Sequence, residues 1–558
     1  MNRFTKSKNN RFPILWVIFI LPALASSRPA VAINFQVAGR PGMFMGYLNQ
    51  GAQFGIAGDH YDTRSGFQAA ILQLLLEVNY APSPRLGMFV STNVNVDWAY
   101  PILQSDTRWT EREFDKSKDN LLVLDDYETI LKEAHVTWAP GNFIFRLGKQ
   151  IVAWGETDGI RLMDQINPLD TRRGISDVEF ETTIIPIWLL KAEYYLTSRP
   201  TWVQDLGLEF VFNFNADFIA DKSFATGNNV YGIWAANVPA GDFYDLTSLG
   251  LPGLAYLPTD VISEFPPLLQ PLFNALLSRF PILPGRLGAV NAIIDEPKAW
   301  DPDYFEYGLR MKTVIQDTII TLNGFYGRAN SPVTVGVPKL PEIRVASDGV
   351  LIVEPTVQGF FPLFRFAGFT LTRDFPKLYL EALGGVAPVL RVEALYAFDS
   401  TFASYGKVGL LDQLTGQTEE FGQHDEIRYA IGVDWKVKIR WLNPRDGFRI
   451  SPQFIQRHVC GFPSDYGLMD AGGLPVEENN YYATLMVQTT YFHNKLVPTV
   501  FWQRSWQGAL TGDLIITQLA YERSYHWNYT MQAVWAEGDG LAPLDHKDNV
   551  TVTVAYRF

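Results

Sequence analysis

The residues with the clearest potential for chemistry lie in one charged stretch that contains glycine, from Phe145 to Gly174. Gly155 and Gly159 permit sharp backbone turns within it, and Asn167-Pro168 favours another. Opposed charges on such a loop can narrow a polar passage and set a transverse field across it. The same charges could instead only pin the loop to a neighbouring wall. The candidate constriction residues are Trp154, Glu156, Arg161, Asp164, Asp170, Arg172 and Arg173.

A second set of candidates consists of basic residues on the polar side of predicted strands. Together they could form a positive strip that favours anions. The alternative is that they form salt bridges across the interior of a wide protein, which is the more common role of such residues. The set comprises Arg391, Arg428, Lys436, Lys438, Arg440, Arg449 and Arg457.

The sequence offers little for catalysis or for metal binding. None of the seven histidines belongs to an H-E-x-x-H motif, and the sequence contains no G-x-S-x-G motif. The single cysteine, Cys460, cannot form an internal disulfide, and no C-x-x-C-H haem motif occurs. We therefore predict no catalytic residue, no metal and no cofactor.

A Pro- and Leu-rich insertion, residues 235–303, contains the one predicted helix. Pro266 and Pro267 precede the helix and Pro281 ends it. The helix could block a passage, cap its mouth or receive hydrophobic substrates, or it could belong to a packed subdomain without a ligand. Its apolar residues at helical spacing include Leu269, Leu272, Phe273, Leu276 and Phe280.

The N-terminus has the features of an export signal. A basic segment without acidic residues precedes the apolar run Ile14 to Leu21, and Ala30-Val31-Ala32 provides a cleavage site. We predict that residues 1–32 are removed. Their five basic residues take the formal net charge from −13 to −18, and so acidic a chain is a poor binder of nucleic acid.

The C-terminal segment alternates strictly between apolar and polar residues. Val550, Val552, Val554, Tyr556 and Phe558 share one face. The other face carries Asn549, Thr551, Thr553, Ala555 and Arg557. A terminal strand of this kind that ends in Phe resembles the closing strand of bacterial outer-membrane barrels. In those proteins the final residues are part of the signal read by the assembly machinery, which here implies Val554, Tyr556 and Phe558. The alternative is an edge strand of a soluble sheet, which would expose a hydrophobic edge.

Alternation recurs upstream and predicts the rest of the sheet. The odd-numbered residues from Ile427 to Trp441 are apolar or aromatic, and their even-numbered neighbours are Arg428, Ala430, Gly432, Asp434, Lys436, Lys438 and Arg440. Likewise, Leu390, Val392, Ala394, Tyr396 and Phe398 oppose Arg391, Glu393 and Asp399. Short connections, such as residues 81–85 and 443–447, alternate with long ones, such as residues 155–186 and 403–425. This rhythm is typical of periplasmic turns and extracellular loops. We therefore predict, for residues 33–558, an all-β transmembrane antiparallel barrel of about 18 strands (16 to 20).

The composition agrees with a barrel. Charged residues make up only 19% of the chain, and aromatic residues make up 14%. Soluble domains usually contain about 25% charged residues. Aromatic side chains favour both strands and membrane interfaces.

The run G-K-Q-x-x-x-W-G-E, starting at Gly148, is followed by I-N-P-L-D, starting at Ile166. These motifs resemble those of a proteobacterial outer-membrane family that is known mainly as a domain of unknown function. The resemblance implies an outer-membrane location and does not name a substrate.

These observations favour a porin-like channel or transporter for small solutes and not an enzyme. Its expected partners are outer-membrane lipid, lipopolysaccharide, the barrel assembly machinery and a small solute. Two alternatives stay open: a barrel that carries hydrophobic substrates, and a scaffold barrel of an export or electron-transfer complex.

Overall fold

The computed structural model describes residues 33–56, 66–97, 130–170, 183–197, 200–222, 285–287, 291–337, 342–345, 351–354, 356–378, 386–407, 419–538 and 548–558. The predicted signal peptide, Arg172, Arg173 and the predicted helix with Leu269, Leu272, Phe273, Leu276 and Phe280 lie outside these residues.

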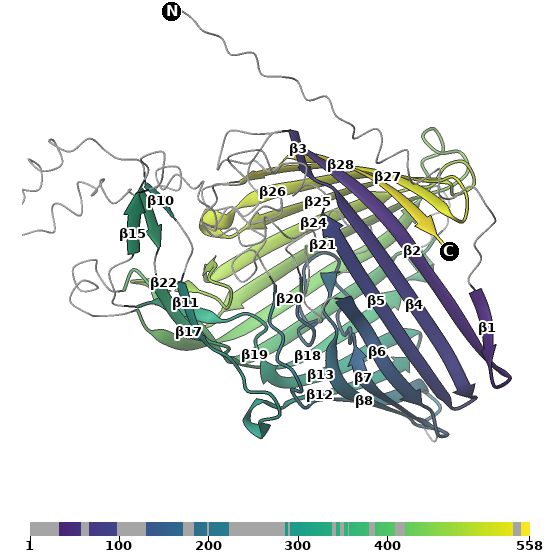
Figure 1. The fold of residues 1–558 in the computed structure, drawn as a ribbon, viewed down its shortest axis with the longest axis horizontal. Coiled ribbons are helices and arrows are strands. Elements are labelled where there is room, and N and C mark those ends of the chain that lie inside the picture. Colours follow the sequence, from purple (N-terminus) through teal and green to yellow (C-terminus); the bar gives the residue numbers. More distant parts are fainter. Residues whose placement is uncertain are drawn as a thin grey trace, which may run out of the picture.

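The described residues form a closed antiparallel β-barrel of 18 strands, which confirms the predicted fold (Figure 1). Each strand pairs with the next around the ring, and the last pairs with the first. The strands are, in ring order, β2 (Arg40–Gly55), β4 (Ile71–Ser83), β5 (Leu86–Asp97), β6 (Leu131–Trp138), β7 (Phe143–Gln150), β8 (Ile187–Tyr195), β9 (Val203–Asn213), β12 (Glu306–Ile315), β13 (Thr318–Arg328), β18 (Leu363–Asp374), β19 (Val389–Tyr405), β20 (Phe421–Val437), β21 (Phe448–Val459), β24 (Asn479–Gln488), β25 (Leu496–Trp506), β26 (Gly512–Glu522), β27 (Trp527–Gly538) and β28 (Asn549–Arg557).

The ring closes between β28 and β2. Their register runs from Tyr47 opposite Arg557 to Gly55 opposite Asn549. Beyond it, the backbones of Gly46 and Phe558 exchange two hydrogen bonds of 2.8 Å each. Because the first and last strands satisfy each other's backbone groups, the sheet has no open edge at this seam.

Side chains alternate between the two faces of the wall, with apolar residues outside. Leu309, Leu322 and Ile431 are 58%, 50% and 45% exposed on the outer face. On the inner face, the hydroxyls of Thr321 and Thr370 lie 2.8 Å apart and are fully buried. The barrel therefore has an apolar outside, as the alternation predicts. Its inside is polar except where wall residues such as Phe366 and Leu395 pack against apolar residues of the segment 152–166.

Connections are short at one end of the barrel and long at the other. Pro84-Arg85 joins β4 to β5, and Gln316-Asp317, both with positive φ, joins β12 to β13. At the other end, residues 151–186 join β7 to β8 and residues 214–305 lead from β9 to β12. The predicted alternation of loop lengths is confirmed, although the connection from β25 to β26 at the long-loop end is short.

One predicted strand is too long. The alternation from Ile427 to Trp441 predicts a strand throughout, but β20 ends at Val437. A turn follows, in which the N–H of Asn443 donates to the carbonyl of Ile439 at 2.9 Å. The buried Asn443 amide also donates to the Thr489 hydroxyl at 2.9 Å, which anchors this turn to the next one. Lys438 and Arg440 therefore lie beyond the strand, and their predicted place on its polar face is wrong.

A bulge interrupts β19. Asp399 has a φ of 47°, and the pairing of β19 with β20 shifts between Ala397 and Ser400. Before the bulge the inward residues are odd-numbered, Glu393 among them, and after it they are even-numbered, Ser400 among them. Asp399 therefore does not share a face with Arg391 as predicted; it forms an ion pair with Arg365. An inserted residue re-aims every side chain that follows.

The remaining elements are short. Figure 1 shows the minor sheets beyond the long-loop end of the barrel and β1 near the other end. Among the described residues, no helix is long and apolar enough to cross a membrane. The short elements outside the ring are β1 (Ile33–Val37), β3 (Gly66–Ala69), β10 (Gly285–Leu287), β11 (Asn291–Asp295), β14 (Val333–Gly336), β15 (Glu342–Val345), β16 (Leu351–Glu354), β17 (Thr356–Phe360), β22 (Gly467–Met469), β23 (Pro475–Val476) and the 3₁₀ turns η2 (Pro302–Tyr304), η3 (Pro376–Leu378) and η5 (Gly508–Leu510).

The close packing of β2 against its two neighbours, β4 and β28, can be tested at Gly46. A Cβ at this position would lie 2.6 Å from the Leu75 carbonyl oxygen and 2.9 Å from the Phe558 ring. Since the carbonyl belongs to a paired strand, we expect Gly46→Ala to lower the free energy of unfolding in urea by about 1–3 kcal/mol. Gly87→Ala is the control, because a Cβ on Gly87 would have nothing within 4 Å of it. Equal stabilities of the two variants would contradict this account of the packing around Gly46.

Candidate functional site

The connection after β7 turns into the barrel and forms the candidate site; we call residues 151–170 the inward loop. Trp154 is fully buried, and its indole Nε1 donates to Glu209 on β9 at 2.7 Å. Arg310 on β12 donates to the carbonyl of Ala153 at 3.3 Å. These contacts hold the start of the inward loop against one side of the wall.

A single carboxylate on β19 holds the middle of the inward loop. Glu393, which is 1% exposed, accepts hydrogen bonds of 2.7 Å from the backbone N–H groups of Glu156 and Met163. Hydrogen bonds to a charged acceptor are shorter and stronger than those between neutral groups. Glu393 therefore fixes two points of the loop at once.

Asp164 braces the same turn from within. Its Oδ1 accepts from the N–H groups of Trp154 at 2.5 Å and Gly155 at 2.8 Å. A Cβ on Gly155 would lie 2.5 Å from Asp164 Oδ2 and 3.4 Å from Glu393. Only glycine fits between the two carboxylates, which explains the glycine of the W-G-E motif.

The tip of the inward loop reaches the far side of the barrel. Asp158 forms an ion pair with Arg391 on β19, and its N–H donates to Gln453 on β21 at 3.2 Å. A Cβ on Gly159 would lie 3.1 Å from the Phe501 ring on β25. Since β25 lies almost half-way around the ring from β7, the loop crosses the interior.

The base of the inward loop is fastened by Asn167, which is fully buried. Its amide donates to the carbonyls of Gln150 and Ile185 at 3.2 and 3.0 Å, and its Oδ1 accepts from Val152 at 2.8 Å. The I-N-P-L-D motif therefore ties the end of β7 to the segment before β8. Arg161 donates to the Asn167 carbonyl at 2.9 Å, and burial lowers the pKa of its guanidinium.

The end of the inward loop is fastened to other loops. The N–H of Asp170 donates to Thr183 at 2.7 Å. The neighbouring Leu169 N–H donates at 2.7 Å to Asp221, whose pKa is raised by burial. Asp221 also accepts from the Ser331 hydroxyl at 2.7 Å.

The predicted basic residues divide into three groups. Arg391, Arg428 and Arg457 lie inside the barrel, and each is paired with acidic residues. Lys436 and Arg449 lie near the short-turn end and contact Asp446 at 2.6 Å and Asp434 at 3.6 Å. Lys438 and Arg440 lie in the turn after β20, so the predicted strip is not one continuous row.

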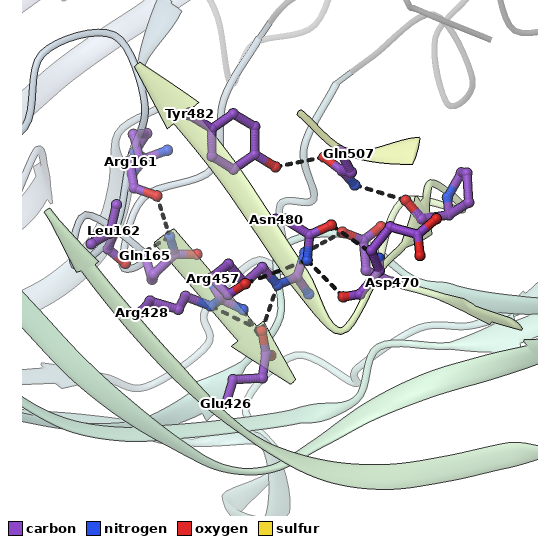
Figure 2. Close-up of polar contacts among 12 residues, drawn as sticks. Arg161, Leu162, Gln165, Glu426, Arg428, Arg457, Asp470, Asn480, Tyr482 and Gln507 are labelled. Carbon is purple, nitrogen blue, oxygen red and sulfur yellow. Dashed lines mark hydrogen bonds and ion pairs between the residues drawn. The ribbon is translucent and has the colours of Figure 1, made fainter. Parts of the chain in front are cut away.

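Arg428 and Arg457 belong to a buried quartet with Glu426 and Asp470 (Figure 2). The Glu426 carboxylate is 1% exposed; it accepts from Arg428 Nη2 at 2.9 Å and from Arg457 Nε at 2.5 Å. Arg457 Nη1 donates to Asp470 at 2.8 Å. The four charges sum to zero, which reduces the cost of keeping them out of water.

The connection from β21 to β24 supplies Asp470, and neighbouring amides hold this connection in place. Asn480, fully buried, donates to the Glu477 carbonyl at 2.8 Å. The Gln507 amide donates to the Pro475 carbonyl at 2.7 Å, and its oxygen accepts from Tyr482 at 2.6 Å (Figure 2).

Sequence reasoning missed the acidic partners of the site: Asp158, Glu393, Glu426, Asp434 and Asp470. Glu393 and Glu426 do carry a signal, because each lies two residues from an arginine on the same inward face. Asp470 carries none, since its connection has no regular period. In the described part of the chain, no group of three or more His, Cys, Asp or Glu residues is arranged to hold a metal ion.

The predicted assembly residues lie at the closing seam. Val554 and Tyr556 are half-buried on β28, and the Phe558 ring lies 6.1 Å from the Phe44 ring and 6.4 Å from the Tyr556 ring. Their recognition by an assembly machinery stays a prediction.

Residues 61–558 match the family model described as a protein of unknown function, DUF1302. The chain belongs to the DUF1302 family. A comparison with curated proteins returns no match.

Solved structures that resemble this DUF1302 protein are outer-membrane barrels with little sequence similarity. OccAB1 of Acinetobacter baumannii has a TM-score of 0.43 at 8% identity, over 96% of this chain and 99% of that chain. A BenF-like porin from Pseudomonas fluorescens has a TM-score of 0.44 at 8% identity, over 93% and 98%. OmpF of Salmonella typhi, in a complex with daunomycin, has a TM-score of 0.37 at 10% identity, over 94% and 100%.

The turn between β20 and β21 allows a test by pH. Hydrogen bonds from Lys436 and Thr490 lower the pKa of Asp446 from 3.8 to about 2. A depressed carboxyl pKa stabilises the folded state above the unfolded pKa, and this advantage is lost as the pH falls through the folded value. We expect wild type to be more stable than Asp446→Asn above about pH 4, by less than about 1 kcal/mol for so exposed a pair, and the two to become equally stable below about pH 2.

This difference is measured as the free energy of urea unfolding across that pH range. Glu522→Gln, which removes an exposed carboxylate at the end of β26, serves as the control. A gap between wild type and Asp446→Asn that does not change with pH would contradict the assignment.

Proposed function

We propose that this protein is a porin-like channel of the bacterial outer membrane that passes small solutes. The observation that carries the proposal is the inward loop, which crosses the barrel interior and is held by Glu209, Glu393 and Arg391 on different strands. A loop fixed in this way narrows the path between the two ends, and its charged groups act on whatever passes.

The two faces of the wall support the proposed membrane location. The outer face carries exposed large apolar residues on strands around the ring, among them Val136, Leu208, Leu322, Ile431 and Leu519. A closed barrel with such a surface satisfies all its backbone groups internally, which a bilayer requires. The export signal predicted for residues 1–32 and the resemblance of the C-terminal strand to the assembly signal agree with this location.

The interior offers two different walls to a solute. On β2, β4 and β5 the inward groups include the neutral amides Gln50, Gln53, Gln73, Asn93 and Asn95. Among them, Gln73 donates to Asn93 at 3.0 Å. The opposite wall, on β19 to β21, carries the charged groups Arg391, Glu393 and Glu426. A polar solute can exchange water for hydrogen bonds on one side while charge on the other side selects it.

Conductance across a planar bilayer tests the channel. Purified full-length mature protein should produce stepwise insertions, each with a steady ionic current that is proportional to voltage. Insertion without conductance, with the barrel shown to be folded by its heat-dependent mobility on a gel, would overturn the proposal.

Removing the anchor of the inward loop should widen the path. Glu393→Ala removes both acceptors of the Glu156 and Met163 N–H groups. We therefore expect a single-channel conductance at least about twofold above wild type, with larger current noise, because the narrowest part of a pore dominates its resistance. Glu522→Ala, an exposed glutamate at the end of β26, should conduct like wild type. Unchanged conductance in Glu393→Ala would show that the loop does not set the constriction.

A further inference from the structure

A cavity of 160 Å³ lies beside the buried quartet, at the end of the inward loop. Its lining includes Glu426, Arg428, Arg457 and Asp470, together with Gln165 of the loop. Sites for drug-sized ligands have volumes of about 300–1,000 Å³, so this cavity suits a smaller molecule.

The two arginines do not use all their donors. Arg428 bonds Glu426 through Nε and Nη2, and Arg457 bonds its two carboxylates through Nε and Nη1. Within the described part of the chain, Nη1 of Arg428 and Nη2 of Arg457 have no acceptor. A guanidinium presents its N–H groups in a rigid fork, so these free ends suit an oxygen acceptor supplied from the cavity.

A third donor comes from the bulge in β19. Ser400 lines the cavity and is 5% exposed, yet its hydroxyl has no partner among the described residues. A buried polar group without a partner is uncommon in a folded protein and calls for a ligand or another explanation. Since the bulge at Asp399 turns Ser400 inward, the same irregularity equips the cavity with this hydroxyl.

The rest of the lining is apolar and aromatic. Phe364 lies under the Arg428 guanidinium at 5.4 Å, and Phe402 lies under the Arg457 guanidinium at 5.6 Å. Pro362, Leu363 and Ala471 complete this side. A ligand that reaches the free donors therefore has apolar surface against the remainder of its body.

We propose that this cavity is a binding site for a small monocarboxylate with an apolar body, such as an aromatic acid. The inference deepens the proposed function and rests on it, since the site would be a stopping place on the solute path. The ligand carboxylate accepts from Arg428 Nη1, Arg457 Nη2 and the Ser400 hydroxyl.

One negative charge fits this site better than two. The quartet is neutral in sum, and Asp221 also lines the cavity. The free N–H groups of the two arginines and the Ser400 hydroxyl are enough donors for one carboxylate. Among the described residues that line the cavity, no further buried side-chain donor is free for a second ligand charge. Weak binding of this kind also suits passage, because a solute that binds tightly does not leave a channel.

Equilibrium dialysis of radiolabelled benzoate against the detergent-solubilised full-length mature protein tests the site. We expect saturable binding of one benzoate per barrel, with benzamide and benzylamine failing to compete. Arg428→Gln should weaken binding about tenfold, as expected for loss of a charge-assisted hydrogen bond. Arg365→Gln is the matched control, because Arg365 lies on β18, next to β19, pairs with Asp399 and does not line the cavity. Benzoate should bind this variant as tightly as it binds wild type.

Ser400→Ala covers the case in which Arg428→Gln does not fold. It removes a hydroxyl that bonds no described residue, so the barrel should remain stable while benzoate binding weakens about threefold, as expected for loss of one neutral hydrogen bond. No saturable benzoate binding, or equal affinity in wild type, Arg428→Gln and Ser400→Ala, would overturn the site. Competition by benzylamine would show that the cavity selects cations, which would also overturn it.

This outcome is separate from that of the proposed function, because dialysis does not depend on ionic current. If the barrel conducts and does not bind benzoate, the proposed channel is supported and the proposed binding site is contradicted. If the barrel binds benzoate and does not conduct, the proposed binding site is supported and the proposed channel is contradicted.

Discussion

The pairing of β28 with β2 is the contact on which the rest of the molecule depends. It joins residues 549–557 to residues 47–55 and ends in the two backbone bonds between Gly46 and Phe558. Once the ring is closed, each strand has two neighbours and the wall separates an apolar outside from an enclosed inside. Any charged or polar group that points inward is then kept from the lipid, and it pairs with other groups within the ring or with water in the lumen.

The interior meets this requirement by pairing charged groups of adjacent strands with one another and with the inward loop. Arg391 is neutralised by Asp158 of the inward loop and by Asp434 of β20, and Glu426 is shared by Arg428 and Arg457. Breaking a buried pair by removing one partner is strongly destabilising, because the other charge stays out of water. The same pairs therefore hold the wall together and set the position of the loop that crosses it.

Much of the fold could be predicted from the sequence, and the site only in part. Strict alternation, as in residues 549–558, and the rhythm of short and long connections depend on neighbours in the chain, so they are legible without a structure. The bond from Met163 to Glu393 joins residues 230 positions apart, and no spacing rule connects them. The end of β20 depends on the bond between Asn443 and Thr489 of another turn, and the bulge at Asp399 interrupts an otherwise regular period.

The Glu393 side chain binds the backbone of the inward loop and not the loop's side chains. The groups it holds are the amide hydrogens of Glu156 and Met163, which any residue except proline would supply equally well. The side chain at Glu156 can therefore be exchanged without loosening the loop, whereas the side chain of Met163 is fully buried in the interior and is not free to change. The position of the loop, which sets the shape of the passage, is therefore independent of the side chain at Glu156. A substitution at this position can change which solutes pass without moving the loop.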